Sequence, residues 1–311
     1  MNPHTPAHMH APAWSFGDRR VWKAENPADQ DRLDHERLAG YFHSELLPWQ
    51  LAVGAATQTL EAARVAATDV DLIVYASEST DSRVDLSRDP NRFAEAIGAP
   101  HVHLVGATAN VCANFGAALR IARDAIRTGD AENVLVVTTD VWDDRSRLVD
   151  AGTCLMSDAA ASVMVSAARP DDGWLIGGVF SAVDHTMHSV DPAQDTIAMV
   201  RGTAGGMRRA ADGFFAMEGH RREDYPFVVA GNVGTTVLRV LAASAQLDLG
   251  RVFARTAENG HCFAADVIVN MTAIQDTVPA GTKVLGLSTG HNYWICVDFE
   301  RIARQPTGVP A

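Results

Sequence analysis

The stretch "HLVGATANVCANFGAALRIARDAI", residues 103–126, decides the fold. It opens on an apolar, strand-like run and passes through small residues. It then places apolar residues at a helical period, at Phe115, Leu119, Ile121, Ala122 and Ile126. Cys112 stands where that helix should begin. The pattern predicts an α/β unit and leaves two interpretations of Cys112, a small buried residue or a nucleophile.

The same alternation continues on both sides of this stretch. Continuous Val, Ile and Leu runs predict strands that are covered on both faces, at residues 71–76, 133–140, 160–167 and 283–288. Helices are expected over residues 46–66, 90–97 and 235–245, and again after His261. The polar break "AARPDDGW", residues 167–174, separates the two series. We therefore expect one half over residues 21–170 and a second half over residues 171–311.

Composition and charge exclude several classes of function. The 311-residue chain is 47% hydrophobic, with a formal net charge of -12 and a pI of about 5.4. An acidic protein is a poor candidate for nucleic-acid binding, because phosphate contacts need clustered Lys and Arg. No apolar run approaches the roughly 18 residues that cross a bilayer, so no membrane segment is expected. Residues 1–20 begin with neither the basic start nor the apolar core of a signal peptide, and we expect a flexible tail there.

The cysteine content indicates a reducing compartment. The four cysteines are too widely spaced for a disulfide framework or a zinc site: Cys112, Cys154, Cys262 and Cys296. We therefore expect a cytoplasmic protein, and no metal site is predicted.

An internal repeat links Cys112 to a second segment. "CANFGAALRIARDAIRTGDAENVLVVTTD" and "GHCFAADVIVNMTAIQDTVPAGTKVLGLSTG" share one order of helix, polar turn and apolar strand. Aligning Ala125 with Ala273 sets Gly260, beside His261, at the position that Cys112 holds. Duplicated α/β halves pack about a pseudo-twofold axis, which brings equivalent helix starts together. The repeat thus predicts that His261 lies near Cys112, with chance similarity between α/β segments as the alternative.

Several phrases, taken in order, resemble the ketosynthase III branch of the thiolase-like superfamily. "VCANF" (111–115) resembles the A-C-A-G-F stretch around the nucleophile of that family, and "LVVTTD" resembles the strand that follows it. "MSDAAAS" (156–162) is similar to its GDGAGA-type turn, and "STGHNYW" (288–294) to its last Gly-rich turn. "GHCFAAD" (260–266) resembles a phrase typical of ketosynthase III-like acyltransferases from natural-product pathways.

The resemblance, over about residues 46–302, implies a fold and an activity. The fold is a five-layer αβαβα arrangement of two duplicated, pseudo-twofold-related halves, usually in a homodimer. The activity is transfer of an acyl group from an acyl carrier protein or coenzyme A thioester to Cys112, and then to a small-molecule acceptor, with no permanently bound cofactor. Backbone N–H groups and the positive dipole end at the helix start should lower the pKa of the Cys112 thiol. Together with Gly290 they should stabilise the oxyanion.

The sequence departs from this family at Gly231. In "VVAGNVGTT" (228–236), Gly231 stands where the family carries its histidine base. A general base contributes about 10²–10⁴ in rate, so a replacement is expected. We expect His261 to be that base. Asp266 either orients its imidazole or complements the helix dipole as a first-turn acid. His291, in the Gly-rich turn, is the alternative base.

Three functions fit this pattern. Loss of the usual histidine and of a second asparagine favours acyl transfer to an amine or hydroxyl, because those groups stabilise the enolate of decarboxylative condensation. Such a condensing enzyme is the first alternative, and a non-catalytic subunit of a ketosynthase-like heterodimer is the second. Arg208 and Arg209 are candidate contacts for a pantetheine phosphate or an acidic carrier protein, or else a solvated helix face. The resemblance places the reaction in natural-product biosynthesis, such as that of an antibiotic.

Overall fold

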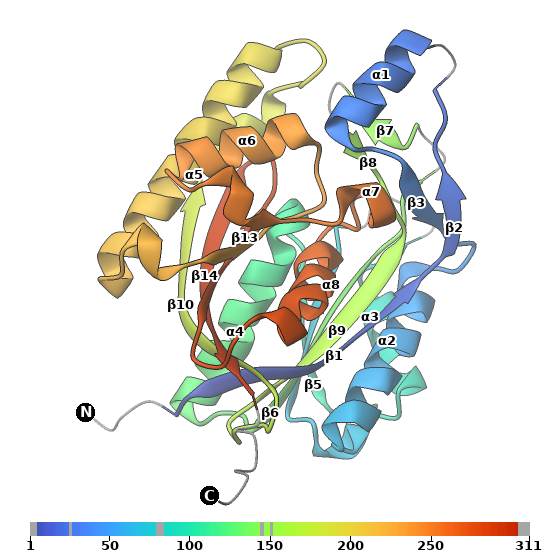
Figure 1. The fold of residues 1–311 in the computed structure, drawn as a ribbon. Helices are drawn as coiled ribbons and strands as arrows, with labels where there is room; N and C mark the ends of the chain where they lie inside the picture. The colour runs from blue at the N-terminus through green and yellow to red at the C-terminus, as the bar shows by residue number, and fades with distance from the viewer. Residues whose placement is uncertain (1–4, 25–26, 79–83, 144–145, 150–151, 304–311) are drawn as a thin grey trace, which may run out of the picture.

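The computed structural model describes residues 5–24, 27–78, 84–143, 146–149 and 152–303. Five strands form the first half of a large sheet: β1 (Ala7–Phe16), β4 (Leu72–Ala76), β5 (His103–Ala107), β6 (Asn133–Asp140) and β9 (Ala159–Ser166). Five more form its second half: β10 (Gly173–Val183), β11 (Phe227–Val229), β12 (Val252–Phe253), β13 (Lys283–Thr289) and β14 (Tyr293–Ile302). Figure 1 shows both halves, which pair into one sheet of 10 strands.

The two halves repeat one strand order. The sheet runs β12-β11-β13-β14-β10-β1-β9-β6-β4-β5, so each half reads the same way outward from the central β1–β10 pair. In each half the central outer strand, β4 or β11, pairs in parallel with both its neighbours, and the remaining pairs are antiparallel. The chain passes from one half to the other between Ser166 and Gly173. The expected duplication is confirmed at the level of topology.

Helices complete five layers around the sheet halves (Figure 1). Helices α2 (Pro48–Ala63) and α3 (Asp89–Ala96) pack on the outer face of the first half. Helices α4 (Asn114–Thr128) and α8 (Ala265–Ile274) lie between the two halves. Helices α5 (Thr196–Glu218) and α6 (Thr235–Ser244) cover the outer face of the second half. The predicted αβαβα class is therefore confirmed.

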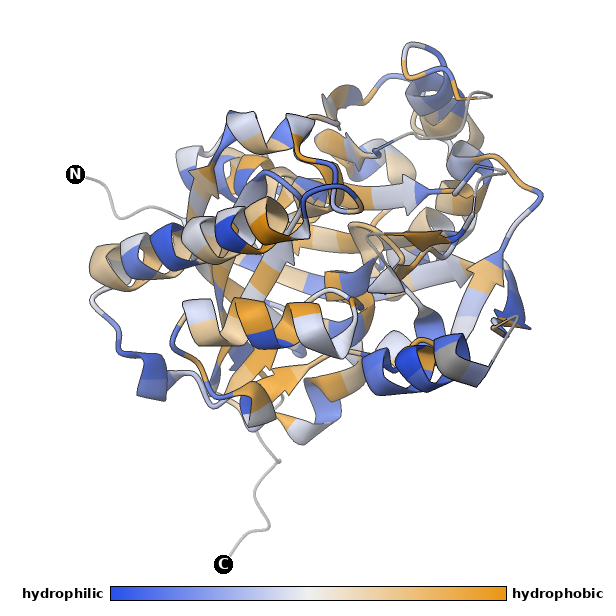
Figure 2. Ribbon diagram, turned by 90° about the horizontal axis from the view of Figure 1, so that it is seen from above, coloured by the Kyte–Doolittle hydropathy of each residue, from blue (hydrophilic) through white to orange (hydrophobic). Residues whose placement is uncertain are grey.

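Continuous apolar strands explain the layering. Successive side chains of a strand point to opposite faces, so a strand covered by helices on both sides must be apolar throughout. In β4, Ile73 and Tyr75 pack with the outer helices, whereas Val74 packs against the central helices. In β13, Leu285 packs toward α5 and α6. Figure 2 shows hydrophobic residues concentrated on the strands and hydrophilic residues on the outer turns.

The flexible tail expected over residues 1–20 is wrong from Ala7 onward. Residues 7–16 form β1, which pairs with β9 on one side and β10 on the other. The register shifts between His10 and Ala13, and Ala11 has a left-handed φ of 50°. Such a bulge accommodates Pro12, which cannot donate a ladder hydrogen bond. Residues 7–16 therefore belong to the centre of the sheet.

Shorter elements surround one end of the central helices. Strands β2 (Asp18–Val21) and β3 (Gly40–His43) pair with each other, as do β7 (Leu148–Val149) and β8 (Cys154–Leu155). Two further α-helices lie in the described residues, α1 (Pro27–Glu36) and the four-residue α7 (Thr256–Asn259). Within the described ranges, no helix is both long and apolar enough to span a membrane.

Candidate active site

Cys112 lies on a strained turn between β5 and α4. The preceding residue, Val111, has a left-handed φ of 55°, which costs a β-branched residue about 1–2 kcal/mol. The Asn114 side chain accepts a hydrogen bond from the Asn110 N–H at 2.9 Å and closes the turn. Next along α4, Gly116 leaves space for Ile295, since a Cβ built on Gly116 would lie 2.8 Å from Ile295 Cγ2. The start of α4 is thereby held against the second half of the sheet.

His261 is held at the mirrored position of the second half. It follows Gly260, which has a positive φ of 64°, and precedes α8. The His261 N–H donates to the Leu155 carbonyl at 2.7 Å, and the His261 carbonyl accepts from the Ser157 N–H at 2.9 Å. The residue is buried and 6% exposed. Backbone bonds on both sides fix where the imidazole points.

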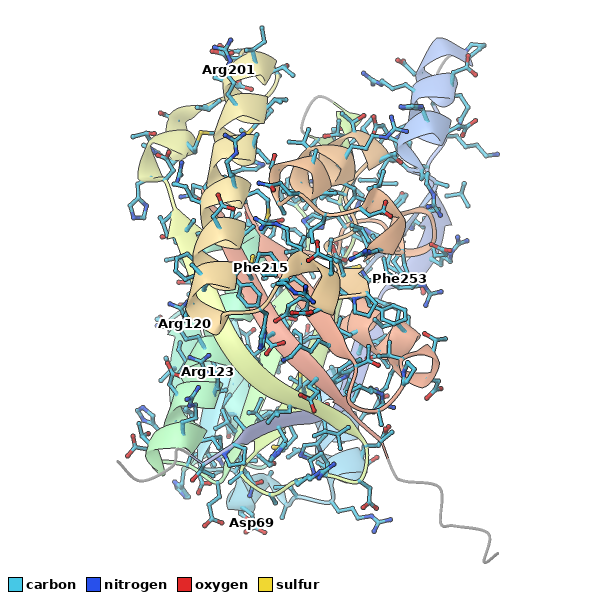
Figure 3. The ribbon with its side chains drawn as sticks, turned by 60° about the vertical axis from the view of Figure 1, so that its left-hand side comes forward. Asp69, Arg120, Arg123, Arg201, Phe215 and Phe253 are labelled. Carbon is cyan, nitrogen blue, oxygen red and sulfur yellow. The ribbon has the colours of Figure 1, made fainter. Side chains whose placement is uncertain are left out.

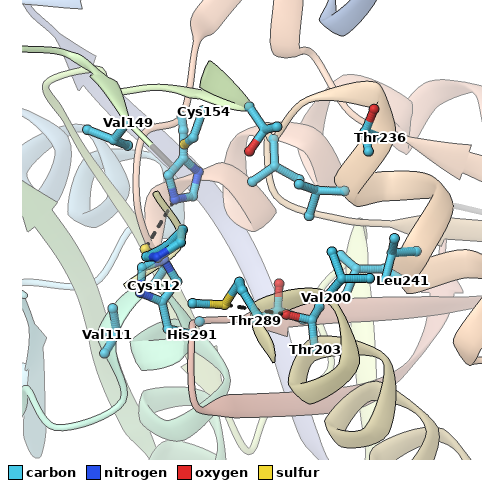
Figure 4. Close-up of a pocket in the computed structure, with 18 of the residues that line it drawn as sticks. Val111, Cys112, Val149, Cys154, Val200, Thr203, Thr236, Leu241, Thr289 and His291 are labelled. Atoms are coloured by element: carbon cyan, nitrogen blue, oxygen red, sulfur yellow. Dashed lines mark hydrogen bonds between the residues drawn. The ribbon is translucent and has the colours of Figure 1, made fainter. Parts of the chain in front are cut away.

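Cys112, His261 and Asp266 form one hydrogen-bonded line. His261 Nε2 lies 3.1 Å from Cys112 Sγ, the contact drawn as a dashed line in Figure 4. His261 Nδ1 lies 2.5 Å from Asp266 Oδ2. Because a carboxylate accepts, Asp266 favours the tautomer with the proton on Nδ1, in which Nε2 faces the sulfur as a hydrogen-bond acceptor. The arrangement has the geometry of a cysteine nucleophile, a base and an orienting acid.

Asp266 is fixed by a second set of hydrogen bonds. Its fully buried carboxylate accepts from the Cys262 N–H at 2.9 Å and from the Asn232 N–H and side-chain amide, both at 2.7 Å. The Asn232 side-chain oxygen in turn accepts from the Arg255 N–H and from Asn270 Nδ2. Asp266, in the first turn of α8, is therefore held between the His261 imidazole and Asn232.

Gly231 faces this pair directly. A Cβ built on Gly231 would lie 3.4 Å from Asp266 Oδ2 and 3.8 Å from His261 Cε1. The space that a larger residue at position 231 would need is occupied by the His261 imidazole and its acid. The small size of Gly231 is therefore what allows the His261–Asp266 pair to occupy this space.

Glu78 approaches the sulfur from another side and changes the expected charge state. The Cys112 thiol donates to Glu78 Oε2 at 3.4 Å. Burial, reinforced by the neighbouring Glu78 carboxylate, raises the pKa of Cys112 well above its usual range. This direction is opposite to the lowering predicted from the helix start, because burial and the nearby Glu78 carboxylate both disfavour the thiolate. The raised pKa favours the thiol form of Cys112.

A cavity of about 350 Å³ opens beside the sulfur. One wall comes from α5 and another from α6, and Figure 4 shows Val200, Thr203, Thr236 and Leu241 around it. Most of its other lining side chains are apolar, among them Trp142, Val149, Met156, Met199, Val233, Val237, Val240 and Trp294. Such a lining suits an apolar group attached to Cys112.

Gly290, in the Gly-rich turn, was expected to help bind the oxyanion, but its N–H group has another partner. Gly290 packs against the Cys112 turn, since its Cβ would lie 3.4 Å from Cys112 N. The Gly290 N–H, however, donates to the Tyr293 carbonyl at 2.8 Å, so it is not free to bind an oxyanion. This bond closes the turn between β13 and β14. His291 lines the cavity, but the imidazole placed against Cys112 is that of His261.

The arginines of α5 lie away from the cavity wall. Arg208 and Arg209 are exposed, and Arg209 approaches Asp184 at 3.5 Å. The α5 residues that line the cavity are Thr196, Met199, Val200 and Thr203. Figure 3 shows α5 along the outside of the molecule, with Arg201 near its end. The interpretation as a solvated helix face fits these positions.

Sequence reasoning missed two residues beside the sulfur. Glu78 follows β4 at the carboxyl end of a parallel strand, the edge where ligands bind in open α/β sheets, and this position was the available signal. Cys154 lines the cavity from β8, and nothing in its sequence context marks it. In the part of the chain that the structure describes, no group of three or more His, Cys, Asp or Glu residues is arranged to hold a metal ion.

Comparisons with known proteins agree with this architecture. The family model described as 3-oxoacyl-[acyl-carrier-protein (ACP)] synthase III matches residues 108–183. A chloroplastic beta-ketoacyl-[acyl-carrier-protein] synthase III of Arabidopsis thaliana is 34% identical over 140 residues, which are 44% of this chain and 34% of that protein. A mycobacterial beta-ketoacyl-[acyl-carrier-protein] synthase III of Mycobacterium marinum is 24% identical over 259 residues, 78% of this chain and 76% of the relative. The matched segments span 34% to 40% of the first curated relatives.

Solved structures share the fold over nearly the whole chain. The acyltransferase ChlB3 aligns with a TM-score of 0.83 and 15% identity, over 97% of this chain and 100% of that one. The 3-oxoacyl-[acyl-carrier-protein] synthase III of Aquifex aeolicus VF5 aligns with a TM-score of 0.78 and 18% identity, over 94% and 99%. At these identities the likeness concerns the fold.

Proposed function

Because the chain belongs to the ketosynthase III-like branch of the thiolase-like superfamily, we propose that it is an acyltransferase with Cys112 as nucleophile. The observation that carries the proposal is the 3.1 Å contact between Cys112 Sγ and His261 Nε2, with Asp266 behind the imidazole. In this proposal His261 acts as the base, because Gly231 has no side chain that could do so.

The first half-reaction loads the cysteine. His261 Nε2 takes the thiol proton as Cys112 sulfur attacks the carbonyl carbon of an acyl thioester. A new S–C bond forms, the old one breaks, and the protonated imidazole returns the proton to the departing thiol. The donor is an acyl carrier protein or coenzyme A, whose phosphopantetheine thiol is that leaving group. The donor is a co-substrate, and the proposal includes no resident cofactor.

The second half-reaction passes the acyl group to a small molecule with a hydroxyl or amine. The apolar cavity favours an apolar acyl group, because each buried methylene contributes about 0.8 kcal/mol. The resemblance of "GHCFAAD" to natural-product acyltransferases supports a role in secondary metabolism. We place the reaction in the cytoplasm and expect a homodimer.

Intact-protein mass spectrometry tests this proposal. Incubation with octanoyl-coenzyme A or an octanoyl carrier protein should add one octanoyl group to the wild-type protein, and peptide mapping should locate it on Cys112. Cys112→Ala should carry no adduct. Cys154→Ala removes a second thiol that lines the cavity and should still be acylated. No adduct on the wild type, or an equal adduct on Cys112→Ala, would rule out the nucleophile.

Decarboxylative condensation is the second candidate, because the curated relatives are named as beta-ketoacyl-[acyl-carrier-protein] synthases. Carbon dioxide released from a malonyl thioester, dependent on Cys112, would establish condensation in place of transfer. A non-catalytic subunit is disfavoured by the complete Cys112–His261–Asp266 line, which such a role does not need.

A further inference from the structure

An imidazole and a carboxylate lie on two sides of the Cys112 sulfur. His261 Nε2 lies 3.1 Å away on one side, and Glu78 Oε2 lies 3.4 Å away on another. Glu78 is partly exposed and lines the same cavity that would hold the acyl group. A substrate bound in this cavity therefore meets both an imidazole and a carboxylate at the reacting atom.

The position of Glu78 is built into the sheet. It follows β4, and its N–H donates to Asp140 Oδ1 at 2.6 Å. The same Asp140 oxygen accepts from the Ser77 hydroxyl at 3.2 Å. Asp140 is the last residue of β6, the strand beside β4, and it is 2% exposed. Two adjacent parallel strands thus fix the backbone that carries this carboxylate.

Loading of Cys112 does not need Glu78. In the first half-reaction His261 both removes the thiol proton and returns it to the leaving thiol, so the proton balance closes without a second base. A carboxylate beside the sulfur opposes formation of the thiolate. Its position is therefore better explained by the second half-reaction, in which a new proton arrives with the acceptor.

We propose that Glu78 is the base of the second half-reaction, a role that rests on the acyltransferase function proposed above. As the acceptor oxygen or nitrogen attacks the acyl carbonyl, Glu78 takes its proton. The new C–O or C–N bond forms, the bond from carbon to Cys112 sulfur breaks, and Glu78 returns the proton to that sulfur. The resting hydrogen bond from the Cys112 thiol to Glu78 is the product of this last transfer.

The same carboxylate selects the acceptor. A negative charge beside the acyl carbonyl repels an anionic acceptor, such as a malonyl group, and leaves neutral hydroxyls and amines favoured. His261 and Glu78 then divide the reaction between them, one for each half. Glu78 thereby acts as a determinant of transfer over condensation.

Glu78→Gln separates the two half-reactions, since it removes the charge with little change of shape. Wild-type and variant proteins are loaded with octanoyl-coenzyme A, freed of excess donor, and chased with water, n-propanol or hydroxylamine. We expect the variant to load at least as fast as the wild type. Its loss of the octanoyl group to water and n-propanol should slow by about 10²-fold or more. Loss to hydroxylamine, a nucleophile that needs little base assistance, should stay within about twofold.

A second readout concerns the thiol itself. Removing the carboxylate should move the pH profile of Cys112 alkylation by iodoacetamide toward lower pH, because one cause of the raised pKa is gone. A merely structural residue would leave this profile unchanged. Glu61→Gln makes the same charge change at an exposed site on α2 and should match the wild type in every assay.

Glu78→Ala with added formate keeps the proposal testable if the glutamine variant folds poorly. A base role predicts that formate restores the chase with n-propanol in the alanine variant and leaves the wild type unchanged. Equal chase rates for wild type and Glu78→Gln, or no rescue by formate, would overturn the assignment of Glu78 alone. Failure of the wild type to form any acyl adduct would instead overturn the acyltransferase function on which the assignment rests.

Discussion

Gly231 leaves the space in which Asp266 and His261 meet, since a β-carbon at residue 231 would lie 3.4 Å from Asp266 Oδ2. Asp266 comes from α8, and Gly231 lies two residues after the end of β11, so the two segments set the position of the imidazole together. This relationship makes the chemistry of the site sensitive to substitutions that do not touch the sulfur.

The loss of loading rate should therefore increase with the size of the side chain placed at residue 231. Gly231→Ala meets its neighbours at ordinary van der Waals distance and should keep most of the loading rate. Gly231→His must displace the imidazole of His261 and should reduce loading by about 10²-fold or more. Stopped-flow loading with octanoyl-coenzyme A measures both. Equal loading by the wild type and Gly231→His would contradict the proposed pairing, and recovery in Gly231→His combined with His261→Ala would support it.

Removing the base should slow loading without unfolding the protein. We expect His261→Ala to load about 10²–10⁴-fold more slowly, because the resting thiol then has no imidazole to deprotonate it. Added imidazole should restore part of this rate. His291→Ala removes the other imidazole of the cavity and serves as the matched control, with loading close to that of the wild type. A larger defect in His291→Ala than in His261→Ala would reverse the assignment.

Asp266 should contribute both to the loading rate and to the stability of the folded protein. Asp266→Asn replaces one acceptor with a donor that faces the Asn232 and Cys262 N–H groups, so about 1–3 kcal/mol of unfolding free energy should be lost. Loading should fall by about 10²-fold or more, because the imidazole loses its orientation and tautomer. Chemical denaturation measures the first effect and stopped-flow loading the second. A stability loss without a rate loss would leave Asp266 as a purely structural acid.

The sequence predicts those parts of the fold that rest on local apolar patterns. Residues 133–140 form β6 as expected, and the helix expected over 235–245 is α6, because continuous apolar runs and helical periods reflect burial directly. The internal repeat placed His261 beside Cys112, and the topology carries the same duplication. These features depend on residues that are close in the chain or on one repeated order of elements.

Features that depend on contacts between distant segments were not predictable. Two glycines of α5 lie against the sheet, since a Cβ at Gly206 would lie 2.2 Å from Trp294 and one at Gly213 2.2 Å from Phe180. They are helical residues that allow α5 to approach the sheet closely. Glu78 and Cys112 meet only because β4 and β5 are adjacent strands, and no spacing in the sequence encodes that distance.

The half-buried His10 of β1 predicts a loss of stability in acid. Burial lowers the pKa of His10 to about 4, whereas an unfolded histidine has a pKa near 6.5. The unfolded chain therefore binds more protons between these values, so stability falls as the pH drops from about 6.5 through 4. We expect His10→Gln to remove up to about 2 kcal/mol of this dependence. Denaturation curves over this range measure it, with the exposed His101→Gln as control, and parallel curves for His10→Gln and the wild type would contradict it.

The depth of the cavity should set the length of the acyl group. Val237 lines the cavity from α6, whereas Leu238, the next residue, packs in the outer core and does not appear among the described lining residues. Val237→Phe should shorten the cavity, so loading with octanoyl-coenzyme A should fall by about 10-fold or more relative to acetyl-coenzyme A. Leu238→Phe makes the same kind of change outside the cavity and should leave that ratio unchanged. Competition between the two donors, followed by mass spectrometry of the loaded protein, measures the ratio directly. A ratio unchanged in Val237→Phe would mean that the acyl chain does not enter between α5 and α6.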